Sequence, residues 1–132
     1  MEITQKDNQQ ILSNKVLIVD DEKLLREAFA RILDKAEFIT LTATTGREAL
    51  EILDKEDISV IVSDISMPDM DGMELLKAVR ERNLNLPVIL ITGNPTVETA
   101  ARAVEYGALR YLLKPLDRDA LIDAVSIAVK LH

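Results

Sequence analysis

Five polar residues stand at the ends of apolar stretches and carry groups suited to phosphoryl chemistry. The stretch VLIVDD ends in Asp20 and Asp21, ISVIVSD ends in Asp64, PVILIT ends in Thr92, and YLLK ends in Lys114. Three neighbouring carboxylates repel one another, so at least one would be protonated unless a cation joined them. Carboxylates together with a carbonyl and waters suit Mg²⁺. A carboxylate nucleophile, a metal, an ammonium and a hydroxyl would form a phosphoryl-transfer site.

Such a site needs no histidine or cysteine. A carboxylate is already deprotonated, and catalysis rests on positioning and on neutralising the phosphoryl oxygens, which Lys114 and Thr92 could do. This matters because the only histidine is His132 and the chain has no cysteine, which excludes thiol nucleophiles, thiolate metal sites and disulfides. Each residue alone also has a structural explanation: the acidic pair can cap the next helix, and Lys114 can be a surface lysine.

Length and charge narrow the class of protein. The 132 residues, 48% of them hydrophobic, suit one folded domain. No apolar run reaches the roughly 18 residues that span a bilayer, and the polar N-terminus lacks the apolar core of a secretory signal. The net charge of −7 and the low aromatic content, 3%, argue against binding to nucleic acid or anionic membranes. We expect a soluble, cytoplasmic, acidic domain.

The elements that position these residues alternate regularly along the chain. Short β-branched or alternating runs predict strands over residues 16–20, 38–43, 58–63, 87–92 and 109–113. Helical spacing predicts helices over residues 22–35, 45–53, 71–82, 94–106 and from 117 onward. Thr45 and Asp71 each stand three residues before a glutamate, which is the capping-box spacing. Asn94 followed by Pro95 predicts an N-cap and first helical residue, and Gly107 a helix C-terminus.

Strict strand–helix alternation predicts an α/β fold with a parallel sheet between two layers of helices. The first, third and fourth strands are the most apolar and belong in the centre, whereas the alternating second strand belongs at an edge. The order 2-1-3-4-5 fits and is the three-layer, doubly wound, flavodoxin-like arrangement, in which ligands bind at the carboxyl ends of the strands. We expect residues 1–14 to form a polar extension, with a helical turn around Ile11 and Leu12, and residues 15–132 to form the domain.

With these motifs in place, the chain resembles the receiver domain of two-component response regulators, the CheY-like fold. The resemblance extends from Lys15 to the C-terminus and rests on VLIVDDE, SDISMPDMDG, ILITG and YLLKP, each after the appropriate strand. It implies that Asp64 accepts a phosphoryl group from a sensor histidine kinase or a phosphotransfer protein. The domain would phosphorylate and dephosphorylate itself with Mg²⁺, and no separate substrate would be turned over.

The resemblance also implies a role for each site residue. Asp21 and Asp64 would ligate Mg²⁺ directly, the backbone carbonyl of Ser66 would be a further ligand, and Asp20 would act through water. Lys114 would pair with Asp64 and then with the phosphoryl group.

Two further residues would form the switch. Thr92 would bond a phosphoryl oxygen, and Tyr111 stands where the family has its aromatic switch. Phosphorylation would then change the surface formed by the fourth helix, fifth strand and fifth helix. The family also suggests a cis bond between Lys114 and Pro115.

Three other functions could use part of the same residues. A Mg²⁺-dependent phosphatase of the haloacid-dehalogenase type usually has a second aspartate where this chain has Ser66, and it needs a cap insertion that is absent. A nucleotide or flavin binder needs a glycine-rich loop after the first strand, where this chain has DDEKLL. A receiver-like interaction module that is never phosphorylated stays open, although the intact acidic and basic positions argue against it.

The sequence also bears on the output that the domain would control. The last helix keeps apolar residues to Leu131, which favours a receiver that continues into a longer protein. The stretch TGNPTVETAARAVEYGALRYLLKPLDRDAL resembles receivers fused to cyclic-di-GMP phosphodiesterase domains. Arg110 stands where many transcriptional receivers have an acidic residue, which argues against simply transferring their mode of dimerisation.

Overall fold

The computed structural model describes residues 14–131. Five strands form one parallel sheet: β1 (Lys15–Val19), β2 (Ile39–Ala43), β3 (Val60–Asp64), β4 (Val88–Thr92) and β5 (Arg110–Leu113). Five helices follow them in turn: α2 (Lys23–Lys35), α3 (Gly46–Lys55), α4 (Gly72–Arg82), α5 (Val97–Glu105) and α6 (Arg118–Leu131). The strand order is β2-β1-β3-β4-β5, as predicted, and every neighbouring pair is parallel.

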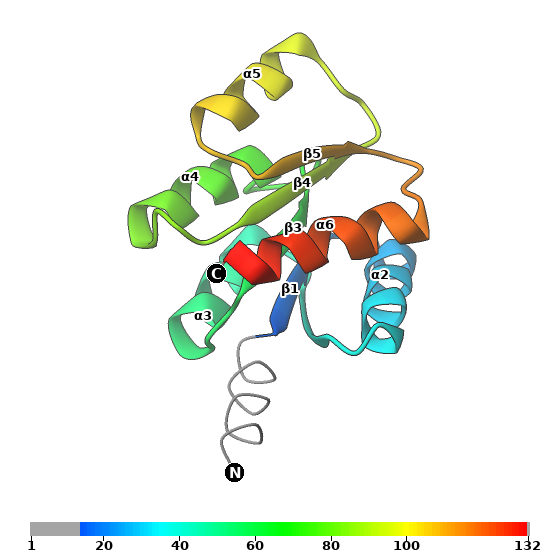
Figure 1. Cartoon of the computed structure of the whole chain (residues 1–132). Helices are drawn as coiled ribbons and strands as arrows, with labels where there is room; N and C mark the ends of the chain where they lie inside the picture. The colour runs from blue at the N-terminus through cyan, green and yellow to red at the C-terminus, as the bar shows by residue number, and fades with distance from the viewer. Residues whose placement is uncertain (1–13, 132) are drawn as a thin grey trace.

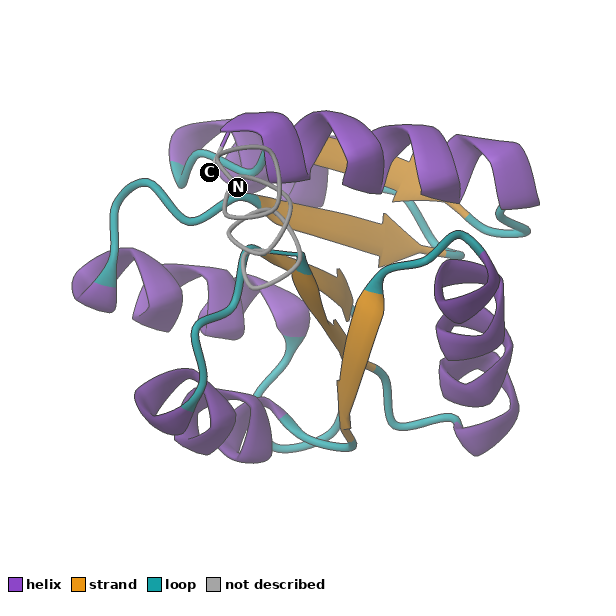
Figure 2. Ribbon diagram, turned by 60° about the horizontal axis from the view of Figure 1, so that its bottom comes forward, coloured by secondary structure: helices purple, strands orange, loops and turns teal. Residues whose placement is uncertain are grey.

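The sheet lies between two layers of helices (Figures 1 and 2). Helices α2 and α6 cover one face, where Phe29 and Leu33 pack with Leu121 and Val125 in one hydrophobic cluster. Helices α3, α4 and α5 contribute to the cluster on the other face. Strands β3 and β4 are buried along their whole length, whereas β2 and β5 at the edges are partly exposed. The prediction from apolar content about central and edge strands is therefore confirmed.

Most helix ends follow the predicted capping signals. The Thr45 side chain accepts a hydrogen bond from the Glu48 amide, and Asp71 and Glu74 form a complete capping box at the start of α4. Gly107 has a φ of 74°, which is the left-handed conformation expected just after a helix. Helix α6 begins directly after Asp117. Among residues 14–131, no helix is long and apolar enough to cross a membrane.

One predicted helix start is wrong. Helix α5 begins at Val97 with Thr96 as its N-cap, two residues further along than the predicted start at Pro95 with Asn94 as N-cap. The Thr96 side chain accepts the Thr99 amide, and the Thr99 side chain accepts the Thr96 amide. Asn94 stays in the loop because its amide donates to the Thr92 hydroxyl oxygen at 3.0 Å. The predicted helical turn around Ile11 and Leu12 lies outside the described residues.

Candidate functional site

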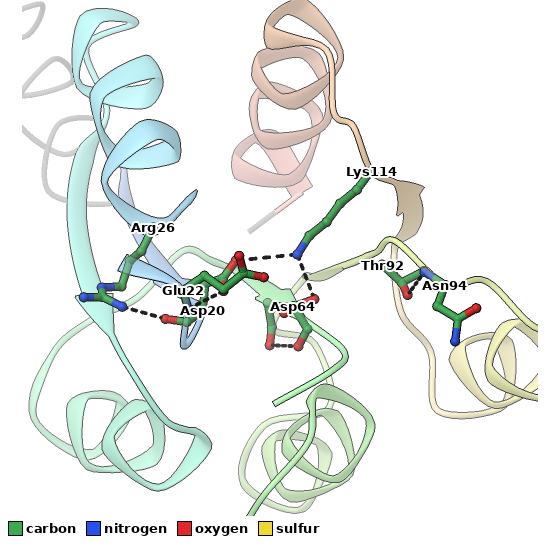
Figure 3. A network of polar contacts seen from close by, with 8 residues as sticks. Asp20, Glu22, Arg26, Asp64, Thr92, Asn94 and Lys114 are labelled. Atoms are coloured by element: carbon green, nitrogen blue, oxygen red, sulfur yellow. Dashed lines mark hydrogen bonds and ion pairs between the residues drawn. The ribbon is translucent and has the colours of Figure 1, made fainter. Parts of the chain in front are cut away.

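The candidate site lies at the carboxyl ends of β1, β3, β4 and β5, where the parallel topology brings together residues that are far apart in sequence (Figure 3). Asp20 directly follows β1, Asp64 is the last residue of β3, Thr92 is the last of β4, and Lys114 directly follows β5. The carboxylates, the hydroxyl and the ammonium therefore lie at the carboxyl ends of the strands, where the sequence predicted them.

The three carboxylates form one compact cluster. Carboxylate oxygens of Asp20, Asp21 and Asp64 all lie within 4.8 Å of one another. Asp20 and Asp64 are buried, with 1% and 4% of their surface exposed, whereas Asp21 faces solvent. Two buried carboxylates at this distance repel each other more strongly than they would in water, because the surrounding protein screens their charge poorly.

The carboxylate of Asp20 is held on one side only. Its Oδ1 accepts a hydrogen bond from the Glu22 amide at 2.9 Å. Its Oδ2 is buried and has no hydrogen-bond partner. A buried polar atom without a partner costs about 1–3 kcal/mol. The donor chemistry therefore fits a hard divalent cation, which would use that oxygen together with its acidic neighbours.

Lys114 is the positive charge that faces this cluster. Its Nζ lies 3.3 Å from Asp64 Oδ1 and 3.9 Å from Asp20 Oδ2, and its side chain is 18% exposed. Figure 3 shows the ammonium between the two carboxylates. One lysine cannot balance three acidic groups, so the cluster keeps a net negative charge. The Lys114–Pro115 bond is cis, as the resemblance suggested.

Burial raises the pKa of both inner carboxyls. Desolvation is the largest cause for Asp20 and for Asp64. The backbone hydrogen bond from Glu22 and the charge of Lys114 act in the opposite direction on the pKa of Asp20. The charge and hydrogen bond of Lys114, with a backbone hydrogen bond from Ser66, do the same for the pKa of Asp64. The charged form of each carboxylate is therefore under-stabilised by the protein alone.

Thr92 is close to this cluster but bonded to its own loop. It is buried, and its Oγ1 accepts the Asn94 amide. Tyr111, on the neighbouring strand β5, is partly buried and packs against the core. Its hydroxyl lies 2.7 Å from Thr99 Oγ1 in the first turn of α5. The structure thus brings four predicted groups, the carboxylates of Asp20, Asp21 and Asp64 and the ammonium of Lys114, into one cluster, with Thr92 at its border and Tyr111 on β5.

Two residues that shape the site were not assigned to it from the sequence. Arg26, on α2, donates from Nη1 to the backbone carbonyl of Asp20 at 2.9 Å and so fixes the turn that carries the acidic pair. Gly72, at the start of α4, lies so close to β3 that a Cβ there would stand 2.3 Å from the Asp64 carbonyl oxygen. The sequence signals were an arginine in the first helical turn and an Asp-Gly pair, both of which are common.

Comparison with known families identifies the class of protein. The family model described as "Response regulator receiver domain" matches residues 16–126. This match covers the five strands apart from Lys15, the first four helices, the first part of α6 and all of the site residues. The chain therefore belongs to the receiver domains of two-component response regulators.

The curated relatives that the chain matches are longer regulatory proteins. The chain is 42% identical over 118 residues to the C4-dicarboxylate transport transcriptional regulatory protein DctD of Pseudomonas aeruginosa, covering 89% of this chain and 26% of that protein. It is 39% identical over 114 residues to the DNA-binding transcriptional regulator NtrC of Escherichia coli, covering 86% and 24%. The chain spans about a quarter of the length of these relatives.

Solved structures confirm the CheY-like fold. A receiver domain protein of Methanospirillum hungatei superposes with a TM-score of 0.85 at 26% identity, covering 89% of this chain and 94% of that one. A chemotaxis protein of Vibrio cholerae superposes with a TM-score of 0.82 at 34% identity, covering 86% and 97%. The signal receiver domain of an HD domain-containing protein of Pseudomonas fluorescens gives 0.84 at 27% identity, covering 88% and 94%.

Proposed function

We propose that Asp64 is the phosphoacceptor of this receiver domain and that its donor is the phosphohistidine of a sensor histidine kinase or phosphotransfer protein. A carboxylate oxygen of Asp64 attacks the phosphorus, and a new P–O bond forms. The P–N bond breaks, and its electron pair stays on the imidazole nitrogen of the donor. The product is an acyl phosphate, and water attacking the phosphorus later returns the free carboxylate and inorganic phosphate. The supporting observation is the buried Asp64 carboxylate, which lies 3.3 Å from Lys114 within an acidic cluster.

The acidic cluster would hold Mg²⁺. Asp20, Asp21, Asp64 and the backbone carbonyl of Ser66 would supply its oxygen ligands, directly or through water. When bound, the ion would neutralise the cluster and the charge of the incoming phosphoryl group. The unpartnered Oδ2 of Asp20 and the burial of two of the three carboxylates support this assignment.

Lys114 and Thr92 would recognise the attached phosphoryl group. The Lys114 ammonium lies between Asp20 and Asp64 and can donate to a phosphoryl oxygen. The Thr92 hydroxyl would exchange its bond with the Asn94 amide for one to the phosphoryl group. The loop that leads into α5 would follow, and Tyr111 would take up the vacated space.

A partner or a fused output domain would recognise the resulting change on the face formed by α5, β5 and α6. Five large apolar side chains are exposed on these elements: Val97, Val104, Leu113, Ile127 and Leu131. The curated relatives carry transcriptional-regulator names, and one similar structure comes from an HD domain-containing protein. We propose an output within a longer cytoplasmic regulator; a cyclic-di-GMP phosphodiesterase output stays a prediction from the sequence.

The test is phosphorylation by acetyl phosphate with and without Mg²⁺, read as intact mass. We expect a Mg²⁺-dependent gain of one phosphoryl group that is absent in Asp64→Asn. Asp69→Asn is the matched control, because Asp69 lies in the exposed loop after β3 and forms an ion pair with Arg47 outside the acidic cluster. If Asp64→Asn gained the group as readily as the native chain, or if neither acetyl phosphate nor a phosphorylated histidine donor modified the native chain, the proposal would be wrong.

A further inference from the structure

The hydroxyl of Tyr111 is bonded to the start of α5. It lies 2.7 Å from Thr99 Oγ1, and either atom can donate. Thr99 is in the first turn of α5, and Tyr111 is on β5. The bond therefore connects the strand that carries the aromatic switch to the helix that follows Thr92.

Thr99 also takes part in the cap of α5. Its Oγ1 lies 2.9 Å from Thr96 Oγ1 and accepts the Thr96 amide at 3.3 Å. Its own amide donates to Thr96 Oγ1 at 3.0 Å. A shift of the capping residue would thus displace the hydroxyl that Tyr111 contacts.

The cap is only a short way from the phosphoacceptor site. Between Thr92 and Thr96 lie three residues, and the first hydrogen bond of this loop joins the Asn94 amide to Thr92 Oγ1. So short a connection, in which each residue spans at most about 3.6 Å, couples the position of Thr92 to that of the cap more closely than a longer loop would. Movement of Thr92 toward the phosphoryl group would therefore strain or break the bond between Thr99 and Tyr111.

The other end of α5 is held by Arg80 of α4. Its guanidinium donates to the carbonyl of Tyr106 at 3.1 Å, of Gly107 at 2.8 Å and of Leu86 at 2.7 Å. It also donates to the Asn83 carbonyl at 3.3 Å. These bonds connect the C-terminal end of α5 to the end of α4 and the start of β4. Displacement of α5 would therefore be concentrated at its N-terminal end.

We propose that Thr99 is a positioning residue of the switch. Its hydrogen bond to Tyr111 favours the arrangement in which Thr92 stays bonded to its own loop, and Arg80 fixes the far end of α5. Thr99 thereby sets how readily the domain changes to the arrangement that receives the phosphoryl group. This inference rests on the proposed function of Thr92 and Tyr111.

The first test compares Thr99→Val, which removes the hydroxyl at similar volume, with Thr99→Ser, which keeps it. We expect Thr99→Val to raise the initial rate of phosphorylation by acetyl phosphate about fivefold, the effect of one net hydrogen bond of about 1 kcal/mol. Thr99→Ser should stay near the native rate. Thr96→Ala is the comparison for the helix cap: it weakens the cap, in which Thr99 also takes part, but keeps both hydroxyls of the bond between Thr99 and Tyr111. Its rate should rise less than that of Thr99→Val.

The second test shows whether the effect passes through Tyr111. In a Tyr111→Phe background, Thr99→Val should give no further rate increase, because the bond is already absent. Fluorine NMR of the chain labelled with fluorotyrosine and carrying Tyr106→Phe reports Tyr111 alone, since the chain has two tyrosines. Its resonance should move in Thr99→Val and stay in place in Thr99→Ser.

Equal rates for Thr99→Val and Thr99→Ser, or the same increase in the Tyr111→Phe background, would overturn the inference. If no variant were phosphorylated, the proposed function would fail. The fluorine resonance would then decide about the bond itself, and an unchanged resonance in Thr99→Val would show that Thr99 does not position Tyr111.

Discussion

The substitution Asp20→Asn tests whether the charge of Asp20 stabilises or destabilises the fold when no divalent cation is present. At an effective dielectric constant of about 20, unit charges 3.9 Å apart, the distance from Asp20 Oδ2 to Lys114 Nζ, attract by about 4 kcal/mol. Unit charges 4.8 Å apart, the outer limit for Asp20 and Asp64, repel by about 3.5 kcal/mol. Asp21 is exposed and adds a smaller repulsion. These pair interactions nearly cancel.

Desolvation therefore decides the sign of the effect. Asp20 Oδ2 is buried without a hydrogen bond, and burial is the main cause of the raised pKa of this carboxyl. The asparagine keeps an oxygen for the Glu22 amide and places an NH₂ donor beside the Asp64 carboxylate. We expect Asp20→Asn to raise the free energy of unfolding in EDTA by about 1–2 kcal/mol.

Urea unfolding followed by far-ultraviolet circular dichroism measures this change, because the chain has no tryptophan. Added Mg²⁺ should stabilise the native chain in proportion to the logarithm of its concentration above the dissociation constant, and should stabilise Asp20→Asn much less. Asp123→Asn on the exposed side of α6 is the control and should change stability by less than about 0.5 kcal/mol in either condition. An asparagine variant less stable than the native chain in EDTA, or equally stabilised by Mg²⁺, would refute this account.

Three further predictions concern the same structure. Gly72→Ala should lower the free energy of unfolding by about 1–3 kcal/mol and weaken phosphorylation, because its Cβ would overlap the Asp64 carbonyl. Gly93→Ala, where a Cβ meets only Lys114 side-chain carbons at 3.7 Å, is the control for stability. Ser59→Ala should leave thermal stability unchanged or raise it by up to about 1 kcal/mol, because Ser59 Oγ is buried without a partner; a loss above that size would show an unrecognised bond. The pKa values of Asp20 and Asp64 are raised in the folded protein, so in EDTA their ionisation should lower the free energy of unfolding at pH values above the folded pKa. This destabilisation should disappear as the pH falls to 3.8, the ordinary pKa of an aspartate. Stability curves against pH should therefore show a relative gain on acidification that is smaller in Asp20→Asn.

The topology and most of the candidate site could be predicted from the sequence. The apolar patterns of the strands and helices indicate the topology, and the topology determines which strand ends meet. The apolar content of the strands ranked them from centre to edge, and the parallel sheet then required Asp20, Asp64 and Lys114 to meet at one end. Short-range capping signals such as Asp71 with Glu74 also predicted the local structure correctly.

Features that depend on competition or close approach could not be predicted in this way. Asn94 and Pro95 are residue types typical of a helix start. The helix nevertheless starts after Thr96, whose reciprocal hydrogen bonds with Thr99 form the cap. The position of Arg26 against the Asp20 carbonyl depends on how α2 is oriented after the turn, which no local pattern specifies. The partner of Tyr111 lies 12 residues away in the chain and becomes evident only in the folded structure.

The central claim is that Asp64, and no neighbouring carboxylate, accepts the phosphoryl group. Borohydride reduces an aspartyl phosphate to homoserine, so treatment of the phosphorylated chain followed by peptide mass spectrometry identifies the modified residue. We predict homoserine at position 64 only, and none in a sample prepared without Mg²⁺. Homoserine at Asp20, Asp21 or Asp69, or a phosphorylated chain with position 64 unmodified, would contradict the account.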